Sequence, residues 1–153
     1  MKSDGESSAA PPLNAVLETA LYVDDLEAAE RFYGGALGLP KIFSMPGRQL
    51  VYRCGESILL LFNPERTDRE RVVINGGAIP SHGAHGAGHM AFRVAKTDFD
   101  SWRRRFRENG VAIESEVTWP SGAQSIYFRD PAGNSLELAT PDLWRSLEAN
   151  STP

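Results

Sequence analysis

The chain has 153 residues, of which 41% are hydrophobic and 24% are charged, and these values are those of an ordinary globular protein. At about 150 residues per domain, this length predicts one unit whose core needs no disulfide or metal ion. The net charge of −4 disfavours nucleic acid as a partner, because the chain as a whole would repel phosphate groups.

Membrane insertion and export are disfavoured as well. No apolar run approaches the roughly 18 residues of a membrane span. The first residues, MKSDGESSAAPPL, include no apolar segment of the kind that export signals carry. A single cysteine, Cys54, excludes a disulfide within the chain. Together these features predict a cytoplasmic protein.

The N-terminal part of the chain changes character near residue 16. Residues 1–13 are small, charged or Pro and show no apolar period, so we expect a flexible tail. Residues 16–23 then alternate in the manner of a β-strand. Leu21 lies on one face of this predicted strand, and Glu18 and Tyr22 lie on the other.

A helix and three strands are expected next. Asp24 or Asp25 is a suitable N-cap, apolar residues recur at helical spacing as far as Leu37, and Gly38 is a typical stop. The three short strands are predicted at residues 42–44, 49–53 and 57–62. The first half of the chain therefore reads β-α-β-β-β.

The second half repeats this order. A predicted strand begins at His89, and an apolar helical stripe after it ends at Gly110. The hairpin at residues 52–59 corresponds to the hairpin at residues 128–137, which has a longer turn. An internal repeat of this kind indicates two modules of the same architecture.

We therefore predict an α+β fold in which two βαβββ modules form a paired, curved mixed sheet around a central cleft. The connector between the modules is long enough to predict a functional or mobile segment. A short C-terminal helix is expected to place Trp144 over an exposed sheet edge. The predicted boundaries are 1–13 for the N-terminal tail, 14–62 for the first module, 63–87 for the connector loop, 88–140 for the second module and 141–153 for the C-terminal helix and tail.

Three side chains of ligand type occupy special places in this pattern. Glu18 opens the first strand of the first module, His89 opens the equivalent strand of the second, and Glu137 lies between two leucines in the last strand. If the modules face a shared cleft, the three side chains converge there. Two carboxylates and one imidazole suit a divalent ion such as Fe, Mn, Co, Ni or Zn. Taken singly, each residue has the competing interpretation of a solvated or salt-bridged side chain.

At these residues the sequence resembles a known superfamily. The similarity lies in the runs VDDL, RFY and LGL of the first module and in GHMAF and YFRDPAGNSLEL of the second. These runs resemble the vicinal oxygen chelate superfamily, which includes glyoxalase I, bleomycin resistance proteins, type I extradiol dioxygenases, fosfomycin resistance thiol transferases and methylmalonyl-CoA epimerase. The resemblance covers about residues 16–140 and implies the paired-module fold.

The resemblance also implies where a metal would be held. The ligand positions of such proteins fall here on Glu18, Leu59, His89 and Glu137. Leu59 cannot bind a metal, so three ligands remain, as in the dioxygenases and the fosfomycin enzymes, with Glu18 where those proteins usually carry His. Similar proteins close the cleft within one chain or between two chains and are commonly dimers, so we expect a homodimer.

Strand alternation predicts which other side chains share the cleft. The predicted substrate-contacting residues are Tyr22, Leu59, Arg93, Ser125 and Tyr127. Arg93 is expected to anchor an acidic group of the substrate, and a structural ion pair with Glu18 or Glu137 is the alternative.

Other candidates have weaker support. His82 and His85 lie in a Gly-rich loop, and such a loop would hold metal ligands imprecisely. The only role considered for His82 is that of a lid residue over the cleft. Residues 119–122 are candidates for the rim of the cleft, although core packing is the favoured role of Trp119. The Arg103–Arg105 run is typical of a solvated helix face, and Cys54 has no neighbouring His to make it a nucleophile.

Two classes of function follow. The first is a metal-dependent lyase or isomerase of glyoxalase type, in which a metal held by Glu18, His89 and Glu137 stabilises an oxyanion while Glu18 or Glu137 moves a proton. Ring cleavage by an extradiol-type dioxygenase is the alternative chemistry for the same ligands. The second class is a protein like those of bleomycin resistance, which binds a small molecule without catalysis.

Overall fold

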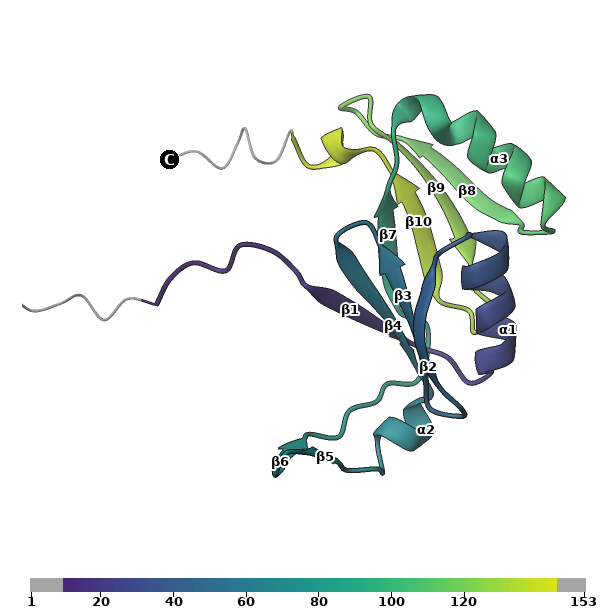
Figure 1. Ribbon diagram of the computed structural model, residues 1–153. Helices are drawn as coiled ribbons and strands as arrows, with labels where there is room; N and C mark the ends of the chain where they lie inside the picture. The colour runs from purple at the N-terminus through teal and green to yellow at the C-terminus, as the bar shows by residue number, and fades with distance from the viewer. Residues whose placement is uncertain (1–9, 146–153) are drawn as a thin grey trace, which may run out of the picture.

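Two four-stranded mixed sheets with the same topology form the framework of the protein, as the α+β prediction requires (Figure 1). The computed structural model describes residues 10–145. The first sheet has the order β1-β4-β3-β2, with bounds Glu18–Tyr22, Ser57–Phe62, Gln49–Cys54 and Lys41–Met45. The second has the order β7-β10-β9-β8, with bounds His89–Arg93, Ser135–Ala139, Gln124–Arg129 and Ile113–Thr118. In each sheet one outer pair of strands is parallel, β1 with β4 in the first and β7 with β10 in the second. The remaining neighbours are antiparallel.

A helix follows the first strand of each sheet. The carboxylate of Asp25 accepts a hydrogen bond from the backbone N–H of Ala28 and caps α1 (Leu26–Glu30), which continues as the π-helical segment η1 (Arg31–Ala36). In the second half, the 3-10 turn η2 (Lys96–Asp98) leads into α3 (Phe99–Glu108). Gly38 and Gly110, at φ 75° and 67°, lie just beyond the two helices in the left-handed conformation that favours glycine, at the predicted stops.

The hydrophobic core is shared by the two halves. Buried side chains of both sheets and of the helices form one cluster. Two polar contacts cross it: the hydroxyl of Tyr33 donates to Asp130 at 2.7 Å, and Nε of Arg105 donates to the carbonyl of Ala36 at 2.7 Å. Because these contacts join buried or half-buried groups, they fix one half against the other as well as contributing to stability.

Asn134 ties the start of β7 to the end of β1. Its Nδ2 donates to the carbonyl of Tyr22 at 3.0 Å, and its Oδ1 accepts from the backbone N–H of Gly88 at 2.8 Å. Gly88 directly precedes His89, so the buried amide of Asn134 helps to set where β7, and with it His89, begins.

The connector holds regular structure that the sequence analysis did not predict. It contains α2 (Pro64–Thr67) and a hairpin of β5 (Val72–Ile74) and β6 (Gly77–Ile79), which projects from the body of the molecule in Figure 1. Asn75 and Gly76, at φ 50° and 83°, form the turn of this hairpin. The tandem Asn-Gly is the sequence signal that could have located it.

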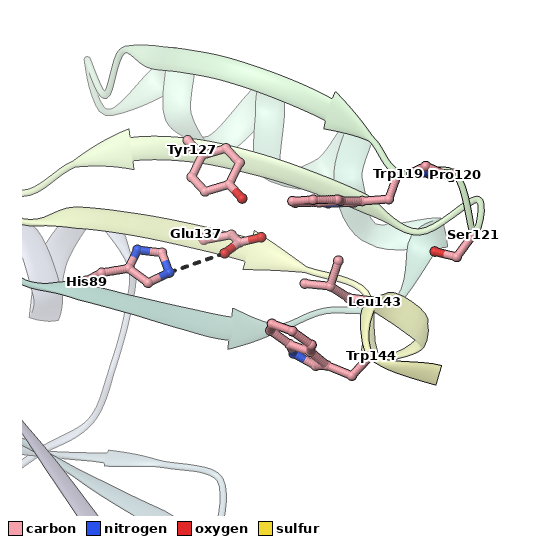
Figure 2. Close-up of a pocket in the computed structure, with 8 residues that line it drawn as sticks. All are labelled: His89, Trp119, Pro120, Ser121, Tyr127, Glu137, Leu143 and Trp144. Carbon is pink, nitrogen blue, oxygen red and sulfur yellow. Dashed lines mark ion pairs between the residues drawn. The ribbon is translucent and has the colours of Figure 1, made fainter. Parts of the chain in front are cut away.

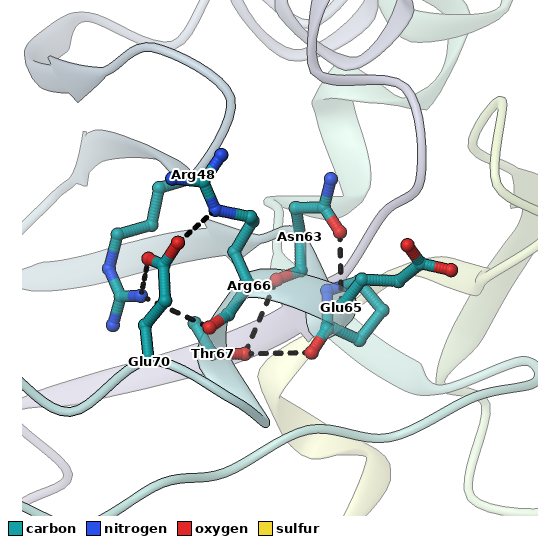
Figure 3. Close-up of polar contacts among 7 residues, drawn as sticks. Arg48, Asn63, Glu65, Arg66, Thr67 and Glu70 are labelled. Carbon is teal, nitrogen blue, oxygen red and sulfur yellow. Dashed lines mark hydrogen bonds and ion pairs between the residues drawn. The ribbon is translucent and has the colours of Figure 1, made fainter.

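A buried arginine fixes α2 to the first sheet (Figure 3). Arg48 is 6% exposed and donates to Glu70 at 2.9 Å and to the carbonyl of Arg66 at 3.4 Å. Glu70 also pairs with the Arg66 guanidinium. At the start of α2, the side chain of Asn63 accepts from the backbone N–H of Glu65 at 3.1 Å. The polar contacts therefore anchor the base of the connector, while the β5–β6 hairpin extends beyond it.

The structure describes only the start of the C-terminal region. Residues Pro141–Leu143 form a single 3-10 turn, η3, and the rest of the expected helix lies largely outside the described residues. Trp144 is 62% exposed, and its role in covering a sheet edge stays a prediction. At the other end, residues 10–13 are exposed and have no regular structure, and residues 1–9 lie outside the described range. Among the described residues, no helix has the length and apolar character needed to cross a membrane.

Candidate active site

His89 and Glu137 face each other on neighbouring parallel strands (Figure 2). In the β7–β10 register, Glu137 lies opposite Ala91, two residues beyond His89, so both side chains project from the same face of the sheet. Nε2 of His89 is 3.4 Å from Oε2 of Glu137. Glu137 is only 4% exposed, whereas about half of the His89 side chain remains accessible. The pair therefore joins a buried carboxylate to an imidazole that a ligand can reach.

A backbone contact orients the imidazole of His89. Its Nδ1 lies 3.1 Å from the carbonyl oxygen of Ser135. Because a carbonyl only accepts, Nδ1 carries the hydrogen, and in the neutral ring Nε2 presents a lone pair. That lone pair points towards a carboxylate oxygen. Two acceptors face each other across 3.4 Å, an arrangement that a proton or a metal cation would stabilise.

A second chain of hydrogen bonds orients Glu137. The indole N–H of Trp119 donates to Oγ of Ser125 at 2.9 Å, and the Ser125 hydroxyl donates to Oε1 of Glu137 at 2.5 Å. Since Ser125 accepts from the indole, its own hydrogen is directed to the carboxylate. Oε1 is thereby engaged, and Oε2 is the oxygen presented to His89.

Tyr127 adds a phenol beside the pair. It lies opposite Glu137 in the β9–β10 register, and its ring stacks on His89 with centroids 6.4 Å apart. Burial, followed by the negative charge of Glu137, raises the pKa of the Tyr127 hydroxyl. At neutral pH this phenol is therefore protonated and available as a hydrogen-bond donor.

These residues line one end of a cavity of about 550 Å³. Figure 2 shows Tyr127 and Trp119 on one side, His89 and Trp144 on the other, and Glu137 between them. The cavity is lined by His89, Trp119, Pro120, Ser121, Tyr127, Glu137, Leu143 and Trp144. Residues 119–121 line this cavity, so Trp119 lies at its rim and not in the hydrophobic core, where it was expected first. Leu143 and Trp144 were not expected here, because no period in the C-terminal segment indicates which way their side chains turn.

The structure does not bring Glu18 to this pair within one chain. Glu18 is exposed at the start of β1, opposite Ile58 of β4. Among the described residues, no group of three or more His, Cys, Asp or Glu side chains is placed to hold a metal ion. One chain therefore supplies two of the three expected ligands, His89 and Glu137, at the same place.

Leu59 does not have the position expected for it. It lies opposite Thr19 in the β1–β4 register, is 1% exposed and belongs to the core cluster. It does not line the cavity that His89 and Glu137 share, but it lines a second cavity, of about 620 Å³, together with Arg93. The residue equivalent to Glu137 is Leu60. Leu60 lies opposite Ala20, which is two residues beyond Glu18, and Glu137 lies opposite Ala91, which is two residues beyond His89. The hairpin correspondence used for Leu59 was wrong by one residue, although Leu60 cannot bind a metal either.

Arg93 and Tyr22 do not line the cavity that His89 and Glu137 share. Arg93 lines a different cavity, of about 620 Å³, together with Thr19 and Trp102. The hydroxyl of Tyr22 is 2.8 Å from Nδ1 of His82, so His82 holds the connector against the end of β1. The role of Arg93 as an anion anchor and that of His82 as a lid residue therefore stay predictions.

Comparisons with known proteins agree with this fold. Residues 15–138 match the family described as the Glyoxalase/Bleomycin resistance protein/Dioxygenase superfamily. The structure of a lactoylglutathione lyase from Agrobacterium tumefaciens is similar to this chain at a TM-score of 0.79 and 42% identity, covering 87% of this chain and 98% of that one. The structure of the fosfomycin resistance protein FosX from Mesorhizobium loti shares the fold at a TM-score of 0.58 and 22% identity, covering 88% of this chain and 97% of that one.

Curated relatives are named metallothiol transferase FosB. The protein of that name from Staphylococcus epidermidis is 26% identical over 137 residues, covering 89% of this chain and 88% of the relative. The match to the Staphylococcus saprophyticus protein is 36% identical over 61 residues and spans 40% of that relative and 39% of this chain. The family match extends over most of the chain and coincides with both sheets. The protein therefore belongs to the Glyoxalase/Bleomycin resistance protein/Dioxygenase superfamily.

Proposed function

We propose that this protein is a metal-dependent enzyme of lyase or isomerase type, acting on a small substrate that chelates a divalent ion through adjacent oxygens. The observation that carries the proposal is the 3.4 Å approach of His89 Nε2 to Glu137 Oε2, with the other polar atom of each side chain already engaged. The similarity to a lactoylglutathione lyase at 42% identity supports the reaction type.

The residues present fit a divalent ion. His89 supplies one imidazole nitrogen and Glu137 one carboxylate oxygen, which are two of the three expected ligands of a mixed nitrogen and oxygen site. In each side chain, a hydrogen bond at the other polar atom fixes the orientation. Such donors suit Fe, Mn, Co, Ni or Zn. A bound ion would supply Lewis-acid polarisation of the substrate oxygens.

We propose Glu18 of a second copy as the third ligand, in a homodimer. β1 and β7 are both edge strands, and both border the same cavity through Thr19 and Arg93. Unpaired strand edges favour association with another chain. The side chains of Val16 and Leu17, just before β1, are more than 70% exposed, which leaves apolar surface for a partner to cover.

The two carboxylates then have different tasks. Glu137 is buried and held by Ser125, which suits a fixed ligand, whereas Glu18 is exposed and suits the proton carrier. In the proposed reaction, one carboxylate takes a proton from carbon beside a substrate carbonyl and returns it to the adjacent position, so that no oxidant is needed. The protonated phenol of Tyr127 is placed to donate a hydrogen bond to a substrate oxygen.

Thiol transfer is a second candidate chemistry at the same metal ligands, because the curated relatives that match most of the chain are named metallothiol transferase. Binding without catalysis is less consistent with the site. A drug-sequestering cleft does not require a buried carboxylate held in one orientation beside an imidazole.

Metal analysis of untagged protein, purified without chelators, tests the proposal. We expect about one equivalent of divalent metal per chain after loading, and a loss of at least about tenfold in affinity in His89→Ala and Glu137→Gln. His85→Ala, which alters an exposed histidine of the connector, is the matched control and should bind normally. Metal-dependent formation of lactoylglutathione would identify the lyase reaction, and metal binding that is unchanged in both ligand variants would contradict the proposal.

A further inference from the structure

The wall of the pocket beyond the His89–Glu137 pair is apolar and aromatic. Trp119, Pro120, Leu143 and Trp144 form most of it. Among the described residues that line the cavity, none is Lys or Arg, and the only formal charge is the carboxylate of Glu137. A compact anion such as a phosphonate would meet no cationic partner on this wall and would approach a negative charge.

The two indoles offer ring surface rather than polar atoms. The N–H of Trp119 is already donated to Ser125, so this side chain presents carbon to the cavity. Trp144 is 62% exposed, which is unusual for so large an apolar side chain and leaves surface that a ligand could cover. In Figure 2 the Leu143 side chain is drawn between the two rings, so that the three side chains together form the apolar wall next to Glu137.

Resting on the proposed metal site, we infer that the ligand of this pocket has two parts. An oxygen-donor head lies at His89 and Glu137, and a flat apolar or aromatic body lies against the wall that Trp119, Leu143 and Trp144 form. The cavity of about 550 Å³ has room for both parts, because pockets for small organic ligands begin at roughly 300 Å³. The wall thus selects for an aromatic body and against a small phosphonate.

A matched set of chelators tests the inference in the metal-loaded protein. Benzohydroxamate and acetohydroxamate present the same pair of adjacent oxygens and differ in a phenyl against a methyl group, while phosphonoformate is a compact anionic chelator. By calorimetry we expect benzohydroxamate to bind at least about tenfold more tightly than either of the others. Equal affinities for the two hydroxamates, or tighter binding of phosphonoformate, would overturn the inference.

Variants locate the effect. Trp144→Ala should reduce the preference for benzohydroxamate over acetohydroxamate severalfold. Metal affinity should be unchanged, because Trp144 takes no part in the hydrogen bonds that orient Glu137. Phe43→Ala removes an exposed aromatic side chain from β2 of the other sheet and should leave the preference intact. A preference that survives Trp144→Ala unchanged would show that the body of the ligand does not lie on this indole.

A metal-free arm separates this inference from the proposed function. Benzamide and acetamide do not need a metal in order to bind. In NMR titrations of the metal-free protein, we expect benzamide, but not acetamide, to shift the indole N–H resonances of Trp119 and Trp144. If metal fails to bind while benzamide still shifts these signals, the metal proposal falls together with the oxygen-donor head, and the apolar or aromatic part of the pocket inference stands. If metal binds and neither benzamide nor benzohydroxamate perturbs the indoles, the pocket inference falls and the metal proposal stands.

Discussion

The hydroxyl of Ser125 donates to Oε1 of Glu137 at 2.5 Å, and this contact determines which carboxylate oxygen faces His89. Ser125 is itself oriented by the indole N–H of Trp119, whose ring also lines the pocket. The position of a proposed metal ligand thus depends on two residues that would not touch the metal.

Removing this hydroxyl should weaken metal binding. In Ser125→Ala, Glu137 loses the donor to Oε1 and becomes free to rotate, so we expect about a tenfold loss in metal affinity in calorimetric titrations. Ser121→Ala, which changes a serine on the rim of the same pocket, should bind metal as the wild type does. Equal metal affinity in Ser125→Ala and in the wild-type protein would show that the contact does not orient the ligand.

The raised pKa values of three tyrosines predict a loss of stability at alkaline pH. Burial raises the pKa of Tyr52 to about 12 from an ordinary value of 10.0, and burial raises the pKa values of Tyr33 and Tyr127 in the same direction. The folded state therefore keeps protons that the unfolded state releases above pH 10. This stabilisation is complete below about pH 10 and declines as the pH rises towards and through the folded-state values.

Urea unfolding between pH 9 and pH 11.5 measures the effect. The free energy of unfolding should fall above about pH 10, by up to about 1.4 kcal/mol per pH unit for each of the fully buried Tyr33 and Tyr52. Tyr33→Phe should show a shallower fall, because the residue at this position no longer titrates. A free energy of unfolding that is constant over this range would contradict the assignment of raised pKa values.

The period of the sequence identifies the strands and their alternation, but it does not identify which face of β4 is buried. Both Leu59 and Leu60 are apolar, so their side chains carry no signal that distinguishes core from cleft. The register with β1 decides the matter, and it depends on pairings between distant segments. Glu137 and His89 could be located because a charged residue between two leucines and a histidine at a strand start do distinguish the faces.

Other parts of the site depend on features that no local pattern encodes. The donation from Trp119 to Ser125 joins two residues across the turn between β8 and β9, and its direction follows from the fold of that turn. Trp144 reaches the pocket because η3 turns the chain after β10. By contrast, the helix stops at Gly38 and Gly110 could be predicted, since the left-handed backbone at these positions favours glycine.

The corrected register of β4 has its own test. Leu59→Ala removes a fully buried side chain from the shared core and should lower the free energy of unfolding by about 2–5 kcal/mol. Leu60→Ala, on the face that β4 shares with Glu18 and Ala20, should cost the isolated chain clearly less. Chemical denaturation of the two variants compares the positions directly, and a larger loss in Leu60→Ala would reverse the assignment of the faces.

The central claim is that Glu18 of one copy completes a metal site with His89 and Glu137 of another. Mixing two inactive variants tests it, because a heterodimer of Glu18→Gln and His89→Ala chains contains one site in which all three ligands are intact. After subunit exchange, we predict the return of high-affinity metal binding at about one site per four chains, although neither variant binds tightly alone. No gain in tight metal binding on mixing, under conditions in which exchange is complete, would contradict the shared site.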